Sequence, residues 1–357
     1  MTTPDADSKS GTMKAAVFYG PGEVRVTELP RPAIAAEELL VKVAACAVCG
    51  SDVRTFRHGA RNIDKPVVLG HELSGTIVET GRSITGYREG QRVAVAPAIP
   101  CGQCRYCRRG AQTMCEHLRS IGYEFDGGLA EFMVVPASAV KAGCVNPLPD
   151  GVAFPEAAVA EPLACVINAQ ELLGVGAGDT VVIIGAGPVG CLHAGLARAR
   201  GARLVILVDL RAERLAAART FGADLAIDGS REDVRARVLA ATDGLGASVV
   251  IVAAPSNRAQ EEAVMLAARR GRINFFGGLP KTNPTITLDA NVVHYRELTI
   301  VGSYGSRPDH NRQALELVAR RALPIASLIG LEVPLERVLE GLRAVEEGRV
   351  LKVVVRP

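Results

Sequence analysis

The sequence predicts a two-domain α/β protein, in which an antiparallel β domain is joined to a doubly wound domain with a parallel sheet. Three observations support this fold class. The N-terminal part contains short β-rich runs separated by Gly and Pro, as antiparallel strands do. From about residue 164, Ala- and Leu-rich stretches alternate with continuous apolar runs, as helices and buried parallel strands do. The length of 357 residues fits two domains of about 150 residues each.

The elements follow from these runs in order. The polar residues 1–12 lack a hydrophobic segment and predict a disordered tail that is not a secretory signal. For the first domain we predict strands at residues 14–18, 23–27, 39–43, 73–78, 92–95 and 130–135. For the second we predict parallel strands at 180–184, 203–208, 225–227, 248–252 and 272–276, most of them followed by a helix. The C-terminal part predicts helices at 310–321 and 335–347 and a final strand at 351–355.

Composition excludes several classes of protein. Apolar residues make up 48% and charged residues 22%, and no apolar run reaches the roughly 18 residues of a membrane helix. The net charge of +3 is too small to indicate a nucleic-acid partner. Nine cysteines without a signal peptide indicate a reducing, cytoplasmic setting, where thiols serve metals or catalysis more often than disulfides.

A Gly-x-Gly-x-x-Gly motif follows the first apolar run of the second domain. Gly185 allows the tight turn, Gly187 lets the backbone approach a pyrophosphate, and Gly190 lets the following helix pack closely. Pro188 and Val189 complete the loop, whose free N–H groups at the helix end suit a phosphate. The motif predicts a dinucleotide-binding fold.

An acidic residue stands where this motif requires one. Asp209 lies 19 residues after the last glycine, and would accept hydrogen bonds from the ribose hydroxyls and repel a 2′-phosphate. This favours NAD over NADP, with Leu210 and Arg214 beside the ribose. The alternative is that Asp209 caps the helix starting near Arg211, and both arginines lie close enough to weaken the discrimination.

Four cysteines form a C-x2-C-x2-C-x7-C cluster within fifteen residues: Cys101, Cys104, Cys107 and Cys115. Four thiolates on one short loop can close a tetrahedral zinc shell with no open position, which is a structural site. The alternatives are an iron–sulfur cluster, which uses similar spacings, and a chance cluster of unpaired cysteines.

A second possible metal site is dispersed along the chain. Cys49, His71, Glu72 and Glu161 offer one sulfur, one imidazole and two carboxylates, enough to hold zinc and leave a position for substrate. Taken singly, each has an ordinary interpretation as a surface, capping or core residue.

Together these motifs resemble the zinc-dependent medium-chain dehydrogenase/reductase family, which includes the alcohol and polyol dehydrogenases. The resemblance runs from about Met13 to the C-terminus, with the motifs in the family's order. It implies a GroES-like β-barrel catalytic domain (13–163 and 301–357, with a structural zinc lobe at about 97–118) and a Rossmann cofactor domain (164–300). It also implies a catalytic zinc in the cleft between the domains, and a homo-oligomer, a tetramer or dimer.

The resemblance assigns roles to individual residues. Cys49 and His71 match two zinc ligands, Ser51 matches the hydroxyl that passes the substrate proton towards solvent, and Asp52 lies behind the ligands. Where classical alcohol dehydrogenases have a cysteine, this chain has Glu161-Pro-Leu, as polyol dehydrogenases of the sorbitol (L-iditol) type do. Either Glu72 or Glu161 then binds zinc directly, and the two can exchange; Cys165 is less favoured.

The function implied is hydride transfer from a secondary alcohol, foremost a polyol, to NAD, with two zinc ions per chain. Dehydrogenases for threonine and other amino alcohols, or for aldoses, are the nearest alternatives, because many sorbitol dehydrogenases lack the cysteine lobe. An NAD(H)-sensing zinc protein is more remote, since a sensor has no need of Ser51 beside an open metal site. Zinc-free quinone reductases lack counterparts of the ligands. Three aromatic residues are candidates near the substrate: Phe56, Tyr123 and Tyr304.

Overall fold

The computed structural model describes residues 11–357 and divides them into two compact units. Unit 1 holds the residues up to Pro162 together with Ser306–Arg320 and Ile325–Pro357, and unit 2 holds Leu163–Gly305 and Arg321–Pro324. Of the predicted tail, residues 1–10 lie outside the described residues. Thr12 is already part of a strand, because it pairs with Pro30.

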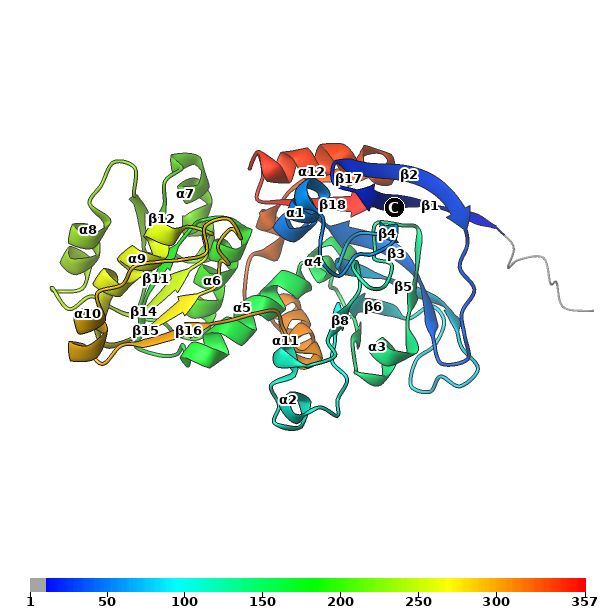
Figure 1. Ribbon diagram of the computed structural model, residues 1–357, viewed down its shortest axis with the longest axis horizontal. Coiled ribbons are helices and arrows are strands. Elements are labelled where there is room, and N and C mark those ends of the chain that lie inside the picture. The colour runs from blue at the N-terminus through cyan, green and yellow to red at the C-terminus, as the bar shows by residue number, and fades with distance from the viewer. Residues whose placement is uncertain (1–10) are drawn as a thin grey trace, which may run out of the picture. The chain divides into compact units, whose positions relative to one another are not determined.

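Unit 1 is built mainly from antiparallel strands (Figure 1). One sheet has the order β2-β1-β4, formed by β1 (Thr12–Gly20), β2 (Glu23–Pro30) and β4 (Val67–Val68). A seven-stranded sheet has the order β10-β6-β5-β3-β18-β17, with β9 also paired to β3. Its strands are β3 (Leu39–Ala47), β5 (Glu72–Thr80), β6 (Arg92–Val95), β9 (Phe132–Val135), β10 (Val145–Pro147), β17 (Ile329–Pro334) and β18 (Lys352–Arg356). A small ribbon pairs β7 (Ala98–Ile99) with β8 (Arg119–Ser120).

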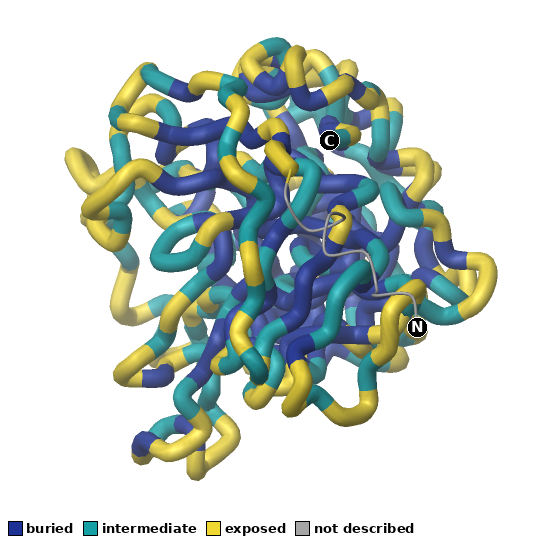
Figure 2. Tube along the Cα trace, turned by 90° about the vertical axis from the view of Figure 1, so that its right-hand side faces the viewer, coloured by how far each residue is buried: buried dark blue, intermediate teal, exposed yellow. Residues whose placement is uncertain are grey.

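Short helices complete unit 1. They are α1 (Gly50–His58), α2 (Arg105–Arg108), η2 (Gln112–Met114), α3 (Ala137–Lys141), α4 (Phe154–Ala158), α11 (Pro308–Ala319), η4 (Ile325–Leu328), η5 (Leu335–Arg337) and α12 (Val338–Glu346). The chain passes into unit 2 within α5 (Ala160–Leu173). Buried and partly buried residues alternate in β9, as expected where a sheet has one face towards the core, whereas β1 is buried without a break from Ala15 to Phe18. Figure 2 shows the buried residues gathered along the inner segments of the chain and the exposed ones mostly at its outer bends.

Unit 2 is a parallel sheet of six strands in the order β13-β12-β11-β14-β15-β16. The strands are β11 (Thr180–Ile184), β12 (Leu204–Asp209), β13 (Leu225–Asp228), β14 (Ala247–Val252), β15 (Ala267–Phe275) and β16 (Thr299–Gly302). The helical elements are α6 (Pro188–Ala199), α7 (Ala212–Ala218), η3 (Arg219–Phe221), α8 (Val234–Ala241), α9 (Asn257–Leu266) and α10 (Ala290–Tyr295). The strands β11, β12 and β14 are buried along almost their whole length, which requires covering helices.

The strand order places the glycine motif at a functional position. β11 pairs with both β12 and β14, so the chain reverses its direction of progress across the sheet beside β11. Ligands of open α/β sheets bind at this switch point, outside the carboxyl ends of the strands. The loop after β11 is the one that carries Gly185 and Gly187.

The predicted fold class, an antiparallel β unit with a doubly wound parallel sheet, is confirmed. All the predicted strands are present, with ends shifted by a few residues; the final strand, for example, is Lys352–Arg356. The helix predicted at 310–321 is α11, which begins at Pro308 because proline suits the first helical turn. The prediction missed α1 and β17, and β17 runs parallel to β18, within an otherwise mostly antiparallel sheet.

Candidate active site and metal centres

Three of the predicted catalytic residues lie together in unit 1. The Cys49 sulfur, one His71 ring nitrogen and one Glu72 carboxylate oxygen all lie within 4.8 Å of one another. Cys49 precedes the first turn of α1, His71 follows β4, and Glu72 is the first residue of β5. Residues 22 positions apart in sequence meet because β4, β5 and α1 converge on this point.

The backbone next to His71 requires glycine. Gly70 has a φ of +95°, where L side chains are strained, and a Cβ at this position would lie 2.6 Å from the Cys46 sulfur and 2.8 Å from the Leu129 Cγ. Packing and backbone conformation therefore both require glycine immediately before His71. At Cys49, the backbone N–H donates to the Asp52 carboxylate at 2.9 Å, which caps α1 and holds the thiol at its N-terminus.

Asp52 and Ser51 lie on opposite edges of the His71 ring. The Asp52 Oδ1 is 3.2 Å from Nδ1, and the Ser51 hydroxyl is 3.3 Å from Nε2. Burial lowers the pKa of His71, but the nearby Asp52 carboxylate and Cys49 thiol outweigh it and raise the pKa well above its ordinary value. A carboxylate beside one ring nitrogen orients the other towards a metal, so Asp52 fits the place behind the ligands that was predicted for it.

Lys352 was missed by the sequence analysis. Its ammonium donates to both oxygens of Glu72, at 2.9 and 2.8 Å, and both side chains are buried. Burial lowers the pKa of Lys352, but the negative charge of Glu72 outweighs it and raises the pKa, with Cys49 and Glu161 adding to the effect. The available signal was a lysine in the otherwise apolar run Leu351–Val355, which predicts a buried partner of opposite charge.

Glu161 lies in the first turn of α5 and is partly buried. Among the described residues it does not join the group formed by Cys49, His71 and Glu72. Its negative charge nevertheless contributes to the raised pKa of Lys352. Of the aromatic candidates, Tyr123 has its ring centroid 5.8 Å from that of His71, and burial raises the pKa of its hydroxyl. Phe56 packs against the core of unit 1, and Tyr304 is exposed on unit 2.

This donor set fits zinc. Thiolate, imidazole and carboxylate are ligands that zinc accepts at about 2.0–2.3 Å, which separates ligand atoms around one ion by roughly 3–4 Å. The observed spread of no more than 4.8 Å needs only small side-chain adjustments. Three protein ligands also leave a fourth position for substrate, as in catalytic zinc sites.

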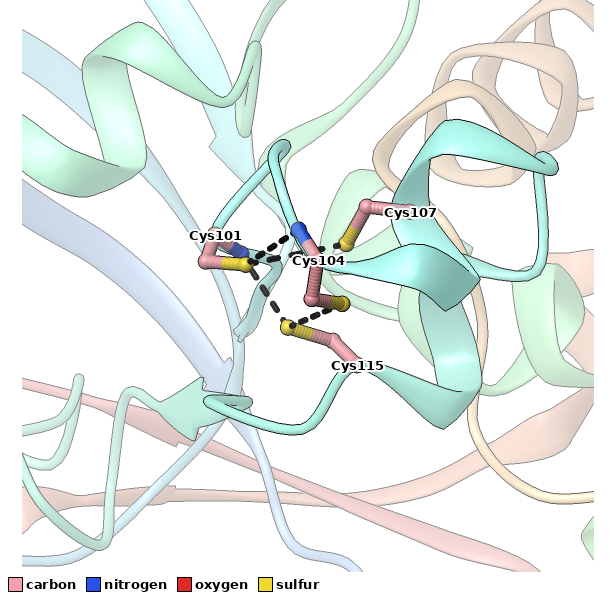
Figure 3. A group of neighbouring side chains, drawn as sticks. All are labelled: Cys101, Cys104, Cys107 and Cys115. Carbon is pink, nitrogen blue, oxygen red and sulfur yellow. Dashed lines mark hydrogen bonds between the residues drawn. The ribbon is translucent and has the colours of Figure 1, made fainter.

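The four clustered cysteines converge on one point in unit 1 (Figure 3). The sulfur–sulfur separations are 4.0 Å for Cys101 and Cys107 and 3.9 Å for Cys104 and Cys115. A tetrahedral zinc with Zn–S bonds of about 2.3 Å separates its sulfurs by about 3.8 Å. The cluster therefore fits a closed tetrahedral site without rearrangement.

Backbone N–H groups surround these sulfurs. The N–H groups of Cys101 and His117 point at the Cys115 sulfur, at 3.2 and 3.4 Å, and that of Cys104 points at the Cys101 sulfur at 3.4 Å. Such donors stabilise thiolates. Backbone hydrogen bonds from Cys107 and Glu116 lower the pKa of Cys104 to about 6.

In unit 2 the glycine loop adopts the conformation that the motif requires. Gly185 has a φ of +108°, and a Cβ at Gly190 would lie 1.7 Å from the Gly185 carbonyl oxygen. Gly187 precedes α6, and a Cβ there would meet nothing within 4 Å. Among the described residues, contacts thus account for glycine at positions 185 and 190, whereas Gly187 has open space around it and is the N-cap of α6. Pro188 and Val189 lie in the first turn of α6.

Asp209 ends β12 and joins this loop. Its carboxylate accepts the Ala186 N–H at 2.7 Å and the Arg211 N–H at 2.9 Å, and Arg214 lies 4.0 Å away. It does not cap α7 directly, since the residue before that helix is Arg211, whose N–H it binds. Leu210, next to it, is 70% exposed, so no packing within the described residues accounts for it.

Comparison with known proteins agrees with this geometry. A family model described as an alcohol dehydrogenase GroES-like domain matches residues 35–149, and a zinc-binding dehydrogenase model matches residues 188–320. Sorbitol dehydrogenase of Halalkalibacterium halodurans is 32% identical over 97% of this chain and 99% of its own length. The chain belongs to the zinc-dependent alcohol dehydrogenase family.

Other members of this family differ in substrate and cofactor. L-threonine 3-dehydrogenase of Bacillus licheniformis is 31% identical over 97% of this chain and 99% of its own length. A zinc-binding dehydrogenase structure from Sinorhizobium meliloti, bound to NADP, superimposes with a TM-score of 0.90 at 33% identity, covering 97% of this chain and all of that one. The chain is thus a zinc-dependent, NAD(P)-linked alcohol dehydrogenase acting on CH–OH groups. No helix among residues 11–357 is long and apolar enough to span a membrane.

Proposed function

We propose that this dehydrogenase oxidises a secondary alcohol of a polyol, of the sorbitol or L-iditol type, to a ketose with NAD as the acceptor. The observation that carries the proposal is the group of Cys49, His71 and Glu72, with the Ser51 hydroxyl 3.3 Å from the His71 ring. These are metal ligands with a proton acceptor beside them, which hydride transfer from an alcohol requires.

Each metal has its own proposed ligands. Cys49 and His71, with a carboxylate from Glu72 or Glu161, would hold a catalytic zinc, and the four clustered cysteines would hold a structural one. A bound catalytic zinc supplies Lewis-acid polarisation of the substrate hydroxyl, which lowers the pKa of that hydroxyl. The structural site has no open position and contributes to folding of its loop.

The side chains around the group provide orientation and proton movement. Asp52 fixes the His71 ring through its contact with Nδ1. Ser51, whose hydroxyl lies 3.3 Å from the His71 ring, accepts the hydroxyl proton and passes it towards solvent. A bound NAD would supply the hydride acceptor, so that the overall reaction would convert the secondary alcohol and NAD to ketone, NADH and one proton.

The cofactor is proposed to bind the loop after β11. Gly185, Gly187, Pro188, Val189 and Gly190 would cradle the pyrophosphate on free N–H groups at the start of α6. Beside them, Asp209 would bind the ribose hydroxyls, with Leu210 and Arg214 flanking. The carboxylate is already held in place by the Ala186 and Arg211 N–H groups, and a 2′-phosphate would face its negative charge, which supports NAD over NADP.

Polyols are favoured as substrates by two features. The side chains that accompany the ligands, Ser51 and Tyr123, present hydroxyls rather than an apolar surface, and the sorbitol dehydrogenase relative matches along nearly its whole length. L-threonine is the second candidate, because the threonine dehydrogenase relative is almost as similar. We also propose that residues 13–163 and 301–357 form the catalytic domain and 164–300 the cofactor domain, and that the chain assembles as a homo-oligomer.

The test is the initial rate of NADH formation by zinc-loaded protein with polyols, L-threonine, aldoses and simple alcohols, each with NAD and with NADP. Polyol oxidation with NAD at the highest kcat/KM is the expected result. Preference for threonine or an aldose would replace the substrate class while keeping the site. Absence of turnover on every alcohol, with zinc and NADH bound, would overturn the assignment of an active catalytic site.

A further inference from the structure

Buried side-chain amides in unit 2 hold the loops that follow β15 and β16. Gln260 in α9 donates to the Gly277 carbonyl at 2.9 Å, in the loop after β15. Asn274 in β15 donates to the Val301 carbonyl at 3.4 Å and accepts the Ser303 hydroxyl at 3.1 Å. Both amide side chains are buried, Asn274 completely. Because a buried amide costs free energy unless it is hydrogen-bonded, an apolar residue would fill either position more simply, and the amides require a reason beyond packing.

A third buried amide holds the other end of the loop after β16. Asn168 in α5 donates to the Gly305 carbonyl at 3.0 Å and to the Tyr304 carbonyl at 3.5 Å. The segment 301–305 is therefore fixed at its start by Asn274 and at its end by Asn168. The side chain of Tyr304 is 68% exposed, so its packing does not fix the segment. The conformation of residues 301–305 thus depends on hydrogen bonds to buried amides.

These loops lie at the edge of the sheet that carries the proposed cofactor site. All six strands are parallel, so their carboxyl ends share one edge, and β12 lies on one side of β11 while β14, β15 and β16 follow on the other (Figure 1). A dinucleotide with its pyrophosphate on the loop after β11 and its adenosine ribose at Asp209 extends its other half over the ends of β14 and β15. Its nicotinamide end then meets the loops that the amides hold.

The same loops offer room for a ligand. A Cβ at Gly278, after β15, or at Gly302, at the end of β16, would meet no atom of the described residues within 4 Å. By contrast, a Cβ at Gly277 would lie 2.6 Å from the Ala254 carbonyl oxygen, so this glycine is required by packing. Open space at Gly278 and Gly302 fits a flat ring lying against the backbone.

We infer that Asn274, acting through Ser303, is a positioning residue that holds segment 301–305 in the conformation that receives the nicotinamide end of NAD. This inference rests on the proposed cofactor site. A fully hydrogen-bonded buried amide specifies one arrangement of its partners, which apolar contacts do not. A loop that already has its bound conformation loses less conformational freedom when the cofactor binds, and this strengthens binding.

ADP-ribose separates this role from a general supporting one, because it keeps the adenosine, the pyrophosphate and the second ribose of NADH but lacks the nicotinamide ring. Asn274→Leu fills a similar volume and removes both side-chain hydrogen bonds. The Kd for NADH should rise about three- to tenfold, the net worth of a typical hydrogen bond, while the Kd for ADP-ribose stays within about twofold of the wild type. Distortion of the whole sheet would weaken both ligands alike.

The experiment is fluorescence titration of the full chain with NADH, followed by displacement of NADH with ADP-ribose. Thr242→Val is the matched control. The Thr242 hydroxyl is also buried and accepts the Gly246 N–H at 3.0 Å, but it holds the loop before β14, at the opposite edge of the sheet. Thr242→Val should lose a comparable buried hydrogen bond and leave the affinities for NADH and ADP-ribose unchanged.

Substitutions at Ser303 keep the inference testable if Asn274→Leu does not fold. Ser303→Ala removes only a hydroxyl of a partly buried loop residue and should weaken NADH binding selectively, whereas Ser303→Thr, which keeps the hydroxyl, should not. Parallel losses of NADH and ADP-ribose affinity, or wild-type NADH affinity in folded Asn274→Leu and Ser303→Ala, would overturn the inference. A wild-type chain that binds neither NADH nor ADP-ribose would instead overturn the proposed cofactor site.

Discussion

Gly187 provides a sharp test of the cofactor loop, because no atom of the described residues crowds the position of its missing side chain. A Cβ at Gly187 would meet nothing within 4 Å, and its φ of −70° and ψ of −176° suit alanine. Gly187→Ala should therefore fold normally, with a free energy of unfolding within about 1 kcal/mol of the wild type, because alanine restricts the unfolded chain but is a poorer N-cap of α6 than glycine. Its expected defect is in cofactor binding alone.

Gly190 supplies the contrast. A Cβ at Gly190 would lie 1.7 Å from the Gly185 carbonyl oxygen and 2.8 Å from its carbon, both backbone atoms that cannot rotate away. Ordinary contact would require α6 to move away from β11 by more than an ångström, and overpacking of this kind costs about 1–3 kcal/mol. Gly190→Ala should therefore lower both stability and cofactor affinity.

The assay pairs thermal unfolding with NADH titration by fluorescence. For Gly187→Ala we expect an unchanged Tm and an NADH Kd raised about tenfold or more, equivalent to about 1.4 kcal/mol of lost binding. For Gly190→Ala we expect a lower Tm as well. Wild-type NADH affinity in Gly187→Ala would refute the assignment of this loop as the pyrophosphate site.

Three further predictions follow from other parts of the chain. Cys104→Ser should lower Tm and release the structural zinc while leaving NADH affinity unchanged, and an unchanged Tm and zinc content would contradict the four-cysteine site. Burial lowers the pKa of His193 to about 3, so between about pH 6.5 and pH 3 this side chain takes up a proton only when the protein unfolds. The free energy of unfolding should therefore decrease as the pH falls below 6.5, by about 2 kcal/mol at pH 5. His193→Leu should remove this part of the pH dependence measured by urea unfolding. Asp209→Gly should raise the ratio of kcat/KM for NADP to that for NAD by about tenfold or more, with Arg214 near to bind the phosphate, and an unchanged ratio would remove Asp209 from cofactor selection.

The sequence predicted the parts of the fold that depend on local pattern. Continuous apolar runs such as Thr180–Ile184 identified the parallel sheet, because strands buried on both faces need no alternation. The glycine motif predicted the turn at Gly185, whose positive φ the structure shows. α1 was missed because its residues, Gly50–His58, are mostly polar, and its start depends on the contact of Asp52 with the Cys49 N–H.

The site shows where sequence reasoning ends. Of the four residues grouped from their types, Cys49, His71 and Glu72 lie together, whereas Glu161 does not join them among the described residues. Lys352, 280 residues from Glu72, was not, because its contact depends on the order of β5, β3 and β18 in the sheet. The order in which distant strands lie in a sheet is a tertiary property, and neither hydrophobic periodicity nor composition encodes it.

The zinc content of Cys49→Ala, measured together with its NADH formation, tests the central claim most directly. The account predicts two zinc ions per wild-type chain, one for each group of ligands, and one in the variant. The variant should keep wild-type NADH affinity and lose NADH formation from its alcohol. A Cys49→Ala protein that retains two zinc ions and full turnover would contradict the account.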